Sequence, residues 1–534
     1  DAAPERLDRP ASLLLWLDAF HKAGQPMGYG LIQRLLAHLQ ARPTLLLLDG
    51  AERLLRAYHN PNAAYQGDAP ADPGEEDGLH ARDCVDPLAE ALLTGLAQQR
   101  GSKTILTSRM LPRPLQGRGR GMLPGVRQLD LPGLSLEETW QLFRNAGITA
   151  SRAEARAVGE PLGYHPLSLR LLAQYAAHDP LRPGDLRAAA DYDPHADLLG
   201  KRQHVLSRAY ASLPPTAQHT LSRLAAFRSS VDGATLAAIM GAGPVRRDLE
   251  RLEERGLLQC TRPPGQPARY DLHPIVRRYA YDRLLNRPEV HAQLVVYFAA
   301  VPAPAKVQSL ADLTPVIEQY HHLTRAGRYD EAFTLFRDRL TSLLYFQLGA
   351  YQTQIELLRA LFPDGEDHPP RLQDEPAQAW TLNTLANSYS LAGRPATAVP
   401  LFEQHNTIYE KRGDKKNLAI GLGNLVGQQI TIGALTAAAA NLRRSITLCQ
   451  EIEDRFEEAV GHQEYGRVLA FCGDAAGAAA ELELSTAYNE ETNDYQGLGI
   501  DAAYRAWTAL LQGDGRTAQT AAQEALRLAD MHGP

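Results

Sequence analysis

An acid and an arginine stand at the ends of two short apolar segments, where they could act on one substrate. Residues 44–50 read TLLLLDG and place Asp49 at the end of an apolar run, while residues 101–109, GSKTILTSR, end a second run with Arg109. A carboxylate can hold Mg²⁺, usually through water, and an arginine can donate two hydrogen bonds to a phosphate. The pair predicts a magnesium–nucleotide site. The plainer alternative is two solvated strand ends.

Strands of a parallel sheet would have to position these two side chains. Short, continuous apolar runs are typical of strands buried on both faces of such a sheet. We predict an amphipathic helix at residues 87–99 between them, and the resulting right-handed crossover makes the strands parallel neighbours. Their carboxyl ends then meet at one sheet edge, where ligands bind in open α/β folds.

Two further acids are candidates for orienting an attacking water. Glu52 follows Asp49 closely, and Asp68 lies in the Pro-, Gly- and Asp-rich stretch 57–78. Long loops in compact domains are either functional or disordered. We favour solvated positions for both acids and assign the loop no chemistry.

Four segments, in this order, resemble the STAND class of NB-ARC-like signalling ATPases. LLLLDG resembles the Walker B strand and TILTSR the sensor segment of that class. LPGLSLEETWQLF (131–143) resembles the entry to its small helical domain, and GYHPLSLRLLA (163–173) its G-x-P-L motif. Ser135 and Glu138 have the capping-box spacing of a helix start. The long loop is similar to that of a bacterial subgroup.

The resemblance implies roles for individual residues. Asp49 and Arg109 would be catalytic and would bind ATP or ADP, with Mg²⁺ on Asp49, and Pro166 would pack near the adenine. LHPIVRRYA (272–280) resembles the family's "MHD" position, which implies that His273 contacts bound ADP, although the usual Asp is missing. A proline at the first turn of a helix is also an ordinary helix start, and this alternative holds for both Pro166 and His273.

Residues 205–288 show three helical periods followed by two short strands with Pro263–Gly265 as their turn, a pattern that resembles a winged helix. Such a fold can place a helix in the DNA major groove. The arginines of residues 246–255 alternate with acids, which favours a solvated face with intrahelical ion pairs over DNA binding. Arg277 and Arg278 follow beyond the wing.

A 40-residue repeat occupies the last part of the chain. Gly393, Gly433, Gly473 and Gly513 are spaced 40 residues apart, as are Asp414, Asp454 and Asp494, which mark the links between units. Each unit reads as a helix, a glycine turn and a second helix with small residues, as in tetratricopeptide-type repeats. Stacked helical pairs bury a core between neighbours and expose a surface for a protein or peptide.

The composition and net charge of the chain argue against several classes of protein. Hydrophobic residues make up 44% and charged residues 22%, as in soluble globular proteins, and the net charge of −7 argues against binding nucleic acid through bulk positive charge. No apolar run is long enough for a membrane span. Four scattered cysteines show no metal-ligand spacing, so we expect a reduced, cytoplasmic compartment.

These patterns predict an α/β fold followed by an all-α part. The predicted order is a truncated P-loop NTPase-type parallel sheet in a nucleotide-binding domain (1–133), a small helical bundle (134–204), a winged helix (205–288), irregular helical hairpins (289–370) and an α-solenoid of repeats (371–534). The resemblance implies a regulatory ATP/ADP switch that oligomerises with itself on activation. A DNA-binding transcriptional regulator and a non-enzymatic repeat scaffold are the alternatives.

The sequence contains no G-x-x-x-x-G-K-[ST] loop. GLGNLVGQQ (421–429) is the nearest glycine cluster, but it lacks the lysine and lies in a predicted repeat helix. The family's loop precedes Walker B, so we expect it on a segment upstream of residue 1.

The 534-residue polypeptide is therefore expected not to hydrolyse ATP, because backbone amides and a lysine that stabilise the β- and γ-phosphates are missing. Phosphate release from Mg-ATP should equal that of an Asp49→Asn variant. Robust release that depends on Asp49 would show that the phosphates are held by other residues.

Overall fold

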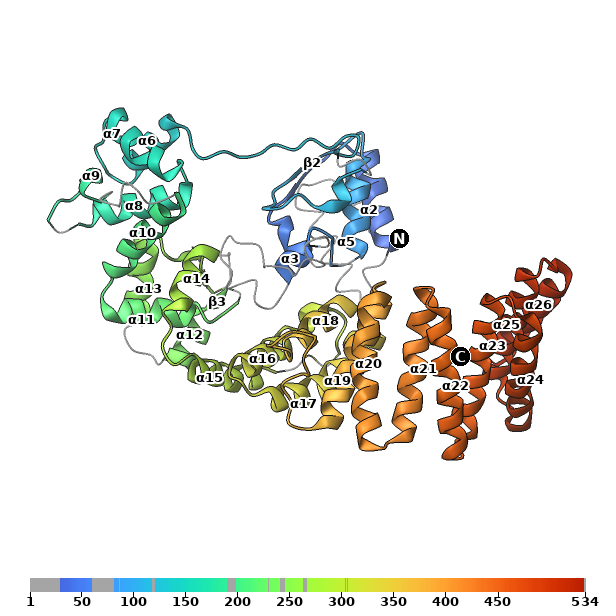
Figure 1. Ribbon diagram of the computed structural model, residues 1–534. Coiled ribbons are helices and arrows are strands. Elements are labelled where there is room, and N and C mark those ends of the chain that lie inside the picture. Colours follow the sequence, from blue (N-terminus) through green and yellow to red (C-terminus); the bar gives the residue numbers. More distant parts are fainter. Residues whose placement is uncertain are drawn as a thin grey trace. The chain divides into compact units, whose positions relative to one another are not determined.

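Helices dominate the computed structural model of the chain (Figure 1). It describes residues 29–59, 81–85, 87–117, 121–179, 181–189, 198–228, 230–240, 245–262, 267–302, 304 and 306–532. The chain divides into two units, Asp1–Arg328 and Tyr329–Pro534. Small sheets in the first unit and a helical-repeat solenoid in the second confirm the general outline of the predicted fold. Within the described residues, no helix is long and apolar enough to cross a membrane.

Two parallel strands form the first sheet, as predicted. Strand β1 (Leu45–Leu48) pairs with β2 (Lys103–Leu106) in the register Leu45↔Lys103 to Leu48↔Leu106. Helices α2 (Tyr29–Ala41) and α5 (Pro87–Ala97) pack together, and their leucines form a core with Leu46 and Leu48. Between the strands lie η2 (Ala51–Leu54) and α3 (Arg56–His59), and η4 (Arg113–Leu115) follows β2.

The prediction that both faces of this sheet are buried was wrong. Leu45 and Leu47 are 61% and 64% exposed, and Ile105 is 54% exposed. Alternate side chains of a strand point to opposite faces, and the described helices cover only the face of Leu46 and Leu48. A continuous apolar run in the sequence therefore shows that both faces of a strand could be buried. It does not show that other elements cover both faces.

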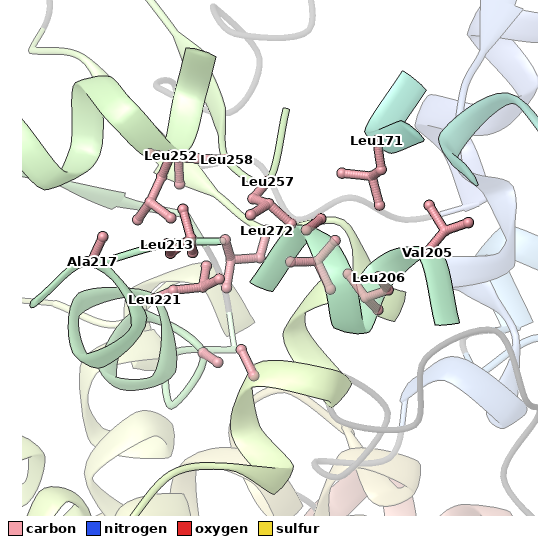
Figure 2. Close-up of a cluster of buried hydrophobic side chains, with 14 of the residues drawn as sticks. Leu171, Val205, Leu206, Leu213, Ala217, Leu221, Leu252, Leu257, Leu258 and Leu272 are labelled. Carbon is pink, nitrogen blue, oxygen red and sulfur yellow. The ribbon is translucent and has the colours of Figure 1, made fainter. Parts of the chain in front are cut away.

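Buried residues between 143 and 294 share one apolar core, and Figure 2 shows leucines from several helices pointing toward one another within it. Ser135 caps α6 with the predicted capping box, in which its side chain accepts from Glu138 N–H and Glu138 accepts from Ser135 N–H. The helices up to the next strand are α6 (Leu136–Asn145), α7 (Arg152–Gly159), η5 (Glu160–Leu162), α8 (Pro166–Ala177), α9 (Leu186–Ala189), α10 (Leu198–Ala211) and α11 (Pro215–Leu224).

A three-stranded antiparallel sheet lies beyond α11. Its strand order is β3 (Val231–Asp232), β5 (Arg269–Asp271), β4 (Gln259–Thr261). Helices α12 (Gly233–Met240) and α13 (Val245–Glu254) lie between β3 and β4 in the sequence, and α14 (Pro274–Asp282) follows β5. Helices and the antiparallel strands β4 and β5 therefore occupy the region predicted to be a winged helix, while the predicted turn Pro263–Gly265 lies outside the described residues.

Residues 287–359 form less regular helices, and the boundary between the two units falls among them, after Arg328. The elements are α15 (Arg287–Ala299), η6 (Leu310–Leu313), α16 (Thr314–Arg325), α17 (Tyr329–Arg339), the π-helical η7 (Leu343–Gln347) and α18 (Tyr351–Arg359).

Four helical hairpins then repeat with the predicted period, drawn in orange to red in Figure 1. The aspartates at the links cap helices: Asp414, Asp454 and Asp494 accept from the N–H groups of Asn417, Glu457 and Gly497. The hairpins are α19 (Glu375–Leu391) with α20 (Pro395–Arg412), α21 (Lys415–Thr431) with α22 (Leu435–Glu451), α23 (Arg455–Phe471) with α24 (Ala475–Thr492), and α25 (Tyr495–Leu511) with α26 (Gly515–His532).

Three buried histidines join α15 and α16. His291 Nδ1 lies 2.9 Å from His322 Nδ1, its Nε2 lies 2.8 Å from the Tyr281 hydroxyl, and His321 packs its ring against both histidines. Burial, with the nearby Arg325 and Arg287, lowers the pKa of His291 from 6.5 to about 3. Burial also lowers the pKa values of His321 and His322 well below 6.5.

This cluster is expected to make the first unit acid-sensitive. These histidines stay neutral in the folded state but take up protons in the unfolded state below pH 6.5, so protonation favours unfolding and the free energy of unfolding falls as pH drops from 6.5 toward 3. Each histidine adds a slope of up to about 1.4 kcal/mol per pH unit to the free energy of unfolding.

Urea unfolding between pH 7.5 and 5 tests this expectation. The slope should be smaller in His322→Phe and unchanged in His178→Gln, which alters an exposed histidine. Equal slopes in all three proteins would contradict it.

Candidate functional site

Asp49 and Thr107 meet at the carboxyl ends of β1 and β2. The Thr107 hydroxyl donates to Asp49 Oδ1 at 2.5 Å and accepts from Gly50 N–H at 2.9 Å. The backbone extends the strand pairing by one step, because Thr107 N–H donates to Leu48 O and Ala51 N–H to Thr107 O, both at 2.9 Å. The parallel register thus orients the Asp49 carboxylate through a threonine on the neighbouring strand.

Arg109 lies at the same edge, beside Glu52. Its Nε is 3.6 Å from Glu52 Oε1, and the two side chains are 29% and 16% exposed. Gly50, at φ 73°, precedes η2, which carries Glu52. Asp49 and Arg109 therefore lie at one edge of the sheet, as the sequence predicted. Glu52 forms an ion pair with Arg109. Asp68 lies outside the described residues.

The chemistry of this edge is that of oxygen ligands beside a cation. A carboxylate and a hydroxyl are hard donors suited to Mg²⁺, which often binds proteins through only one or two carboxylates. The described residues contain no group of three or more His, Cys, Asp or Glu side chains arranged for a metal. Asp49 fits a magnesium ion shared with phosphate oxygens better than a metal held by protein alone.

Pro166 begins α8 after a turn with an unusual backbone. Gly163 and Tyr164 have φ angles of 59° and 50°, and a positive φ is a genuine outlier for a bulky residue such as tyrosine. His165 caps the helix: its Nδ1 accepts from Ser168 N–H at 3.4 Å. Pro166 therefore occupies the first helical turn, which the alternative interpretation also predicted.

The connector from the first sheet docks on this turn through Gly133. Leu134 N–H donates to Tyr164 O at 2.9 Å. A side chain on Gly133 would clash with Gly163 O, and its Cβ would lie 2.9 Å from Tyr164 O. The preceding connector is exposed, with Leu131 at 88%. The turn that carries Pro166 therefore fixes the end of the connector.

His273 caps α14 in the same way that His165 caps α8. Its Nδ1 accepts from Ile275 N–H at 3.4 Å, with Pro274 at the first helical position. Helices α8 and α14 contribute to the same core. His273 thus has a local structural role, and contact with a nucleotide remains a prediction.

The arginines weighed for DNA binding are largely engaged within the protein. Arg277 is 5% exposed and donates to Asp271 and to Arg228 O. On α13, Arg246 pairs with Glu250 at 3.1 Å, and Arg255, which follows the helix, donates to Ser212. These contacts agree with the predicted solvated and ion-paired face.

Sequence reasoning missed three features of these sites. Thr107 orients Asp49 because of the strand register. Gly133 approaches Tyr164 through a contact between positions 31 residues apart. Patterns in a single sequence reveal neither feature. The capping role of His165 had a signal, since a His-Pro pair precedes a helix both there and at His273.

Comparisons with known proteins gave distant structural likenesses only. No protein-family description and no curated protein matches the chain. A STAND protein with a tetratricopeptide repeat sensor from Pyrococcus horikoshii is similar at 15% identity and TM-score 0.37, covering 93% of this chain and 83% of that one.

Two further structures resemble parts of the chain. BtubC (BKLC) from P. vanneervenii has 16% identity and TM-score 0.29, covering 46% and 92% of the two chains. The TPR-like repeats of a putative kinesin light chain from Podosopora anserina have 16% identity and TM-score 0.27, covering 43% and 100%.

Gly133→Ala is expected to detach the connector from the Tyr164 turn, because the added methyl group would overlap a backbone carbonyl that cannot rotate away. The cost is on the order of 1–3 kcal/mol, as for other overpacked positions. Hydrogen exchange at Leu134 N–H should accelerate in the variant. Gly147→Ala is a comparison at a glycine with open space, although its φ of 79° makes alanine strained there. Unchanged protection of Leu134 in Gly133→Ala would contradict the clamp.

Proposed function

We propose that this chain is part of a regulatory ATP/ADP switch of the STAND class, in which Asp49 and Arg109 form the metal and phosphate side of the nucleotide site. The observation that carries the proposal is the hydrogen bond between Thr107 and Asp49 at the carboxyl ends of two parallel strands. Ligands bind at this edge in open α/β sheets. A carboxylate held in one orientation there suits a metal–nucleotide complex.

Asp49 would hold Mg²⁺, which supplies neutralisation of charge on the phosphate oxygens. Thr107 keeps the Asp49 carboxylate in place, and Gly50 N–H keeps the threonine hydroxyl in place. Glu52 holds the guanidinium of Arg109 beside the same edge. Arg109 can then donate to the terminal phosphate by exchanging this long ion pair for shorter hydrogen bonds.

The helical part would bind the base side and report the nucleotide state. Pro166 lies in a turn whose backbone is strained at Tyr164, and such strain is often found at ligand sites. His273 stands before α14 in the part that resembles a winged helix, and contact with ADP would favour the resting form. Because α8 and α14 share a core, a change at either turn can act on the other.

The repeats would act as the sensor. A protein or peptide ligand that binds two forms of the molecule with different affinities shifts the balance between them, and the nucleotide does the same. Activation would then expose surfaces for self-oligomerisation. The alternative of a repeat scaffold without nucleotide chemistry leaves the Asp49–Thr107 pair without a role.

The test is a fusion that supplies a Walker A strand, loop and helix ahead of residue 1. Asp49→Asn keeps the shape of the side chain but removes its charge, so Mg-dependent ATP hydrolysis should fall by about a hundredfold or more. Thr107→Val should lower the rate less, because it only releases the carboxylate.

Asp83→Asn is the matched control, since Asp83 pairs with Arg113 at 3.3 Å outside the proposed site. Hydrolysis at equal rates in all four proteins would refute the Walker B role. A fusion that binds no nucleotide at all would favour the scaffold alternative.

A further inference from the structure

The last two repeats carry exposed aromatic and aliphatic side chains at equivalent positions of neighbouring helices. Trp507 and Leu511 on α25 are 51% and 52% exposed. The positions 40 residues earlier, on α23, are Arg467 and Phe471, and the rings of Phe471 and Trp507 meet edge to face with centroids 5.6 Å apart. Residues four apart lie on one side of a helix, so these side chains form a continuous surface.

We call this surface the first-helix face: the side of α21, α23 and α25 that carries Gly427, Arg467 and Trp507. The helices contact one another in order, α21 with α23 and α23 with α25. Tyr504 on α25 donates to Glu464 on α23 at 2.7 Å. The face therefore continues across three repeats.

The first-helix face contains one ion pair among its described residues. Arg467 Nη2 lies 2.5 Å from Glu464 Oε2, and the Arg467 guanidinium also lies 5.3 Å from the centre of the Tyr504 ring. The corresponding positions on α21 and α25 carry uncharged residues. Because the two charges satisfy each other, the face offers a neutral surface of aromatic rings, aliphatic groups and amides.

On α21 the first-helix face carries glycines, so no side chains project from it at those positions. No heavy atom lies within 4 Å of a Cβ built on Gly423 or Gly427. Gly421 differs, because a side chain there would clash with Asn406. Glycine inside a helix is less stable than alanine, so Gly423 and Gly427 weaken α21 without an internal packing reason. Because these two glycines have no side chain, they leave room for the backbone of another molecule.

We propose that the first-helix face binds an uncharged amphipathic helix of a partner protein. The helix backbone would lie over Gly423 and Gly427, and its apolar side chains would pack against Phe471, Trp507 and Leu511. Charge complementarity selects this occupant: the paired Glu464 and Arg467 offer no excess charge to an acidic or basic segment. This inference rests on the proposed sensor function of the repeats and names the chemistry of the sensed partner.

The experiment selects a displayed library of random 16-residue peptides on the full chain without nucleotide. The selected peptides should carry apolar residues at helical spacing and a net charge near zero. Their binding, measured by biolayer interferometry, should weaken about tenfold or more in Trp507→Ala, as for a buried aromatic anchor. It should weaken similarly in Gly427→Leu, which fills open space and favours the helix.

Gly499→Ala is the matched control. Gly499 also lies inside a helix, but its added Cβ would make an ordinary contact with Leu528 at 3.8 Å. It should raise the melting temperature and leave peptide binding unchanged, while Gly427→Leu should keep a melting temperature at or above that of the parent.

Three results would overturn the proposal. These are selected peptides with strong net charge, binding to Trp507→Ala and Gly427→Leu that is as tight as binding to the parent protein, and enrichment on the parent no greater than on a variant that combines both substitutions. Since the assay contains no nucleotide, failure of ATP hydrolysis in the fusion leaves this result intact, and loss of peptide binding leaves the Asp49 test intact.

Discussion

Each helix or strand of this chain buries one apolar face, and this burial stabilises the fold. The candidate functional residues lie at the ends of these helices and strands. The helices of the first unit from α6 to α15 share one core, and each repeat hairpin packs on the one before it. A helix buried along one stripe still has unsatisfied backbone groups at its ends. Asp, Ser and His side chains satisfy them, and two of these caps, His165 and His273, stand where nucleotide contacts are proposed.

The first sheet follows the same principle but is only half covered. Leu46 and Leu48 face α2 and α5, while Leu45 and Leu47 remain exposed. The covered face is enough to set the strand register, and the register places Thr107 against Asp49. The geometry of the proposed metal site thus depends on one layer of leucine packing. A parallel sheet is normally covered on both faces, so the open face marks where further protein surface could pack.

Local and periodic features were predictable from the sequence, whereas contacts between distant segments were not. The capping box at Ser135, the parallel strands and the 40-residue hairpins have signals within one period or one short motif, and the structure confirms them. The cluster of His291, His321 and His322 joins helices about 30 residues apart in a pattern with no local signature. For the site, residue type and strand order placed Asp49 and Arg109 at one edge. The pairing of Arg109 with Glu52 arises from the folding of η2 against the end of β2 and has no signal in the sequence.

At several positions the residue present makes the fold less stable than another residue would. These positions lie where binding is proposed. Tyr164 has a positive φ beside Pro166, and Gly423 and Gly427 weaken α21 where alanine would fit. Alanine at either glycine would stabilise the isolated helix by roughly 1 kcal/mol. A sequence under selection for stability alone has no reason to keep such residues, whereas a surface approached by another backbone does. The same argument leaves Gly421 and Gly133 as structural, because there a neighbouring group already occupies the space that a side chain would need.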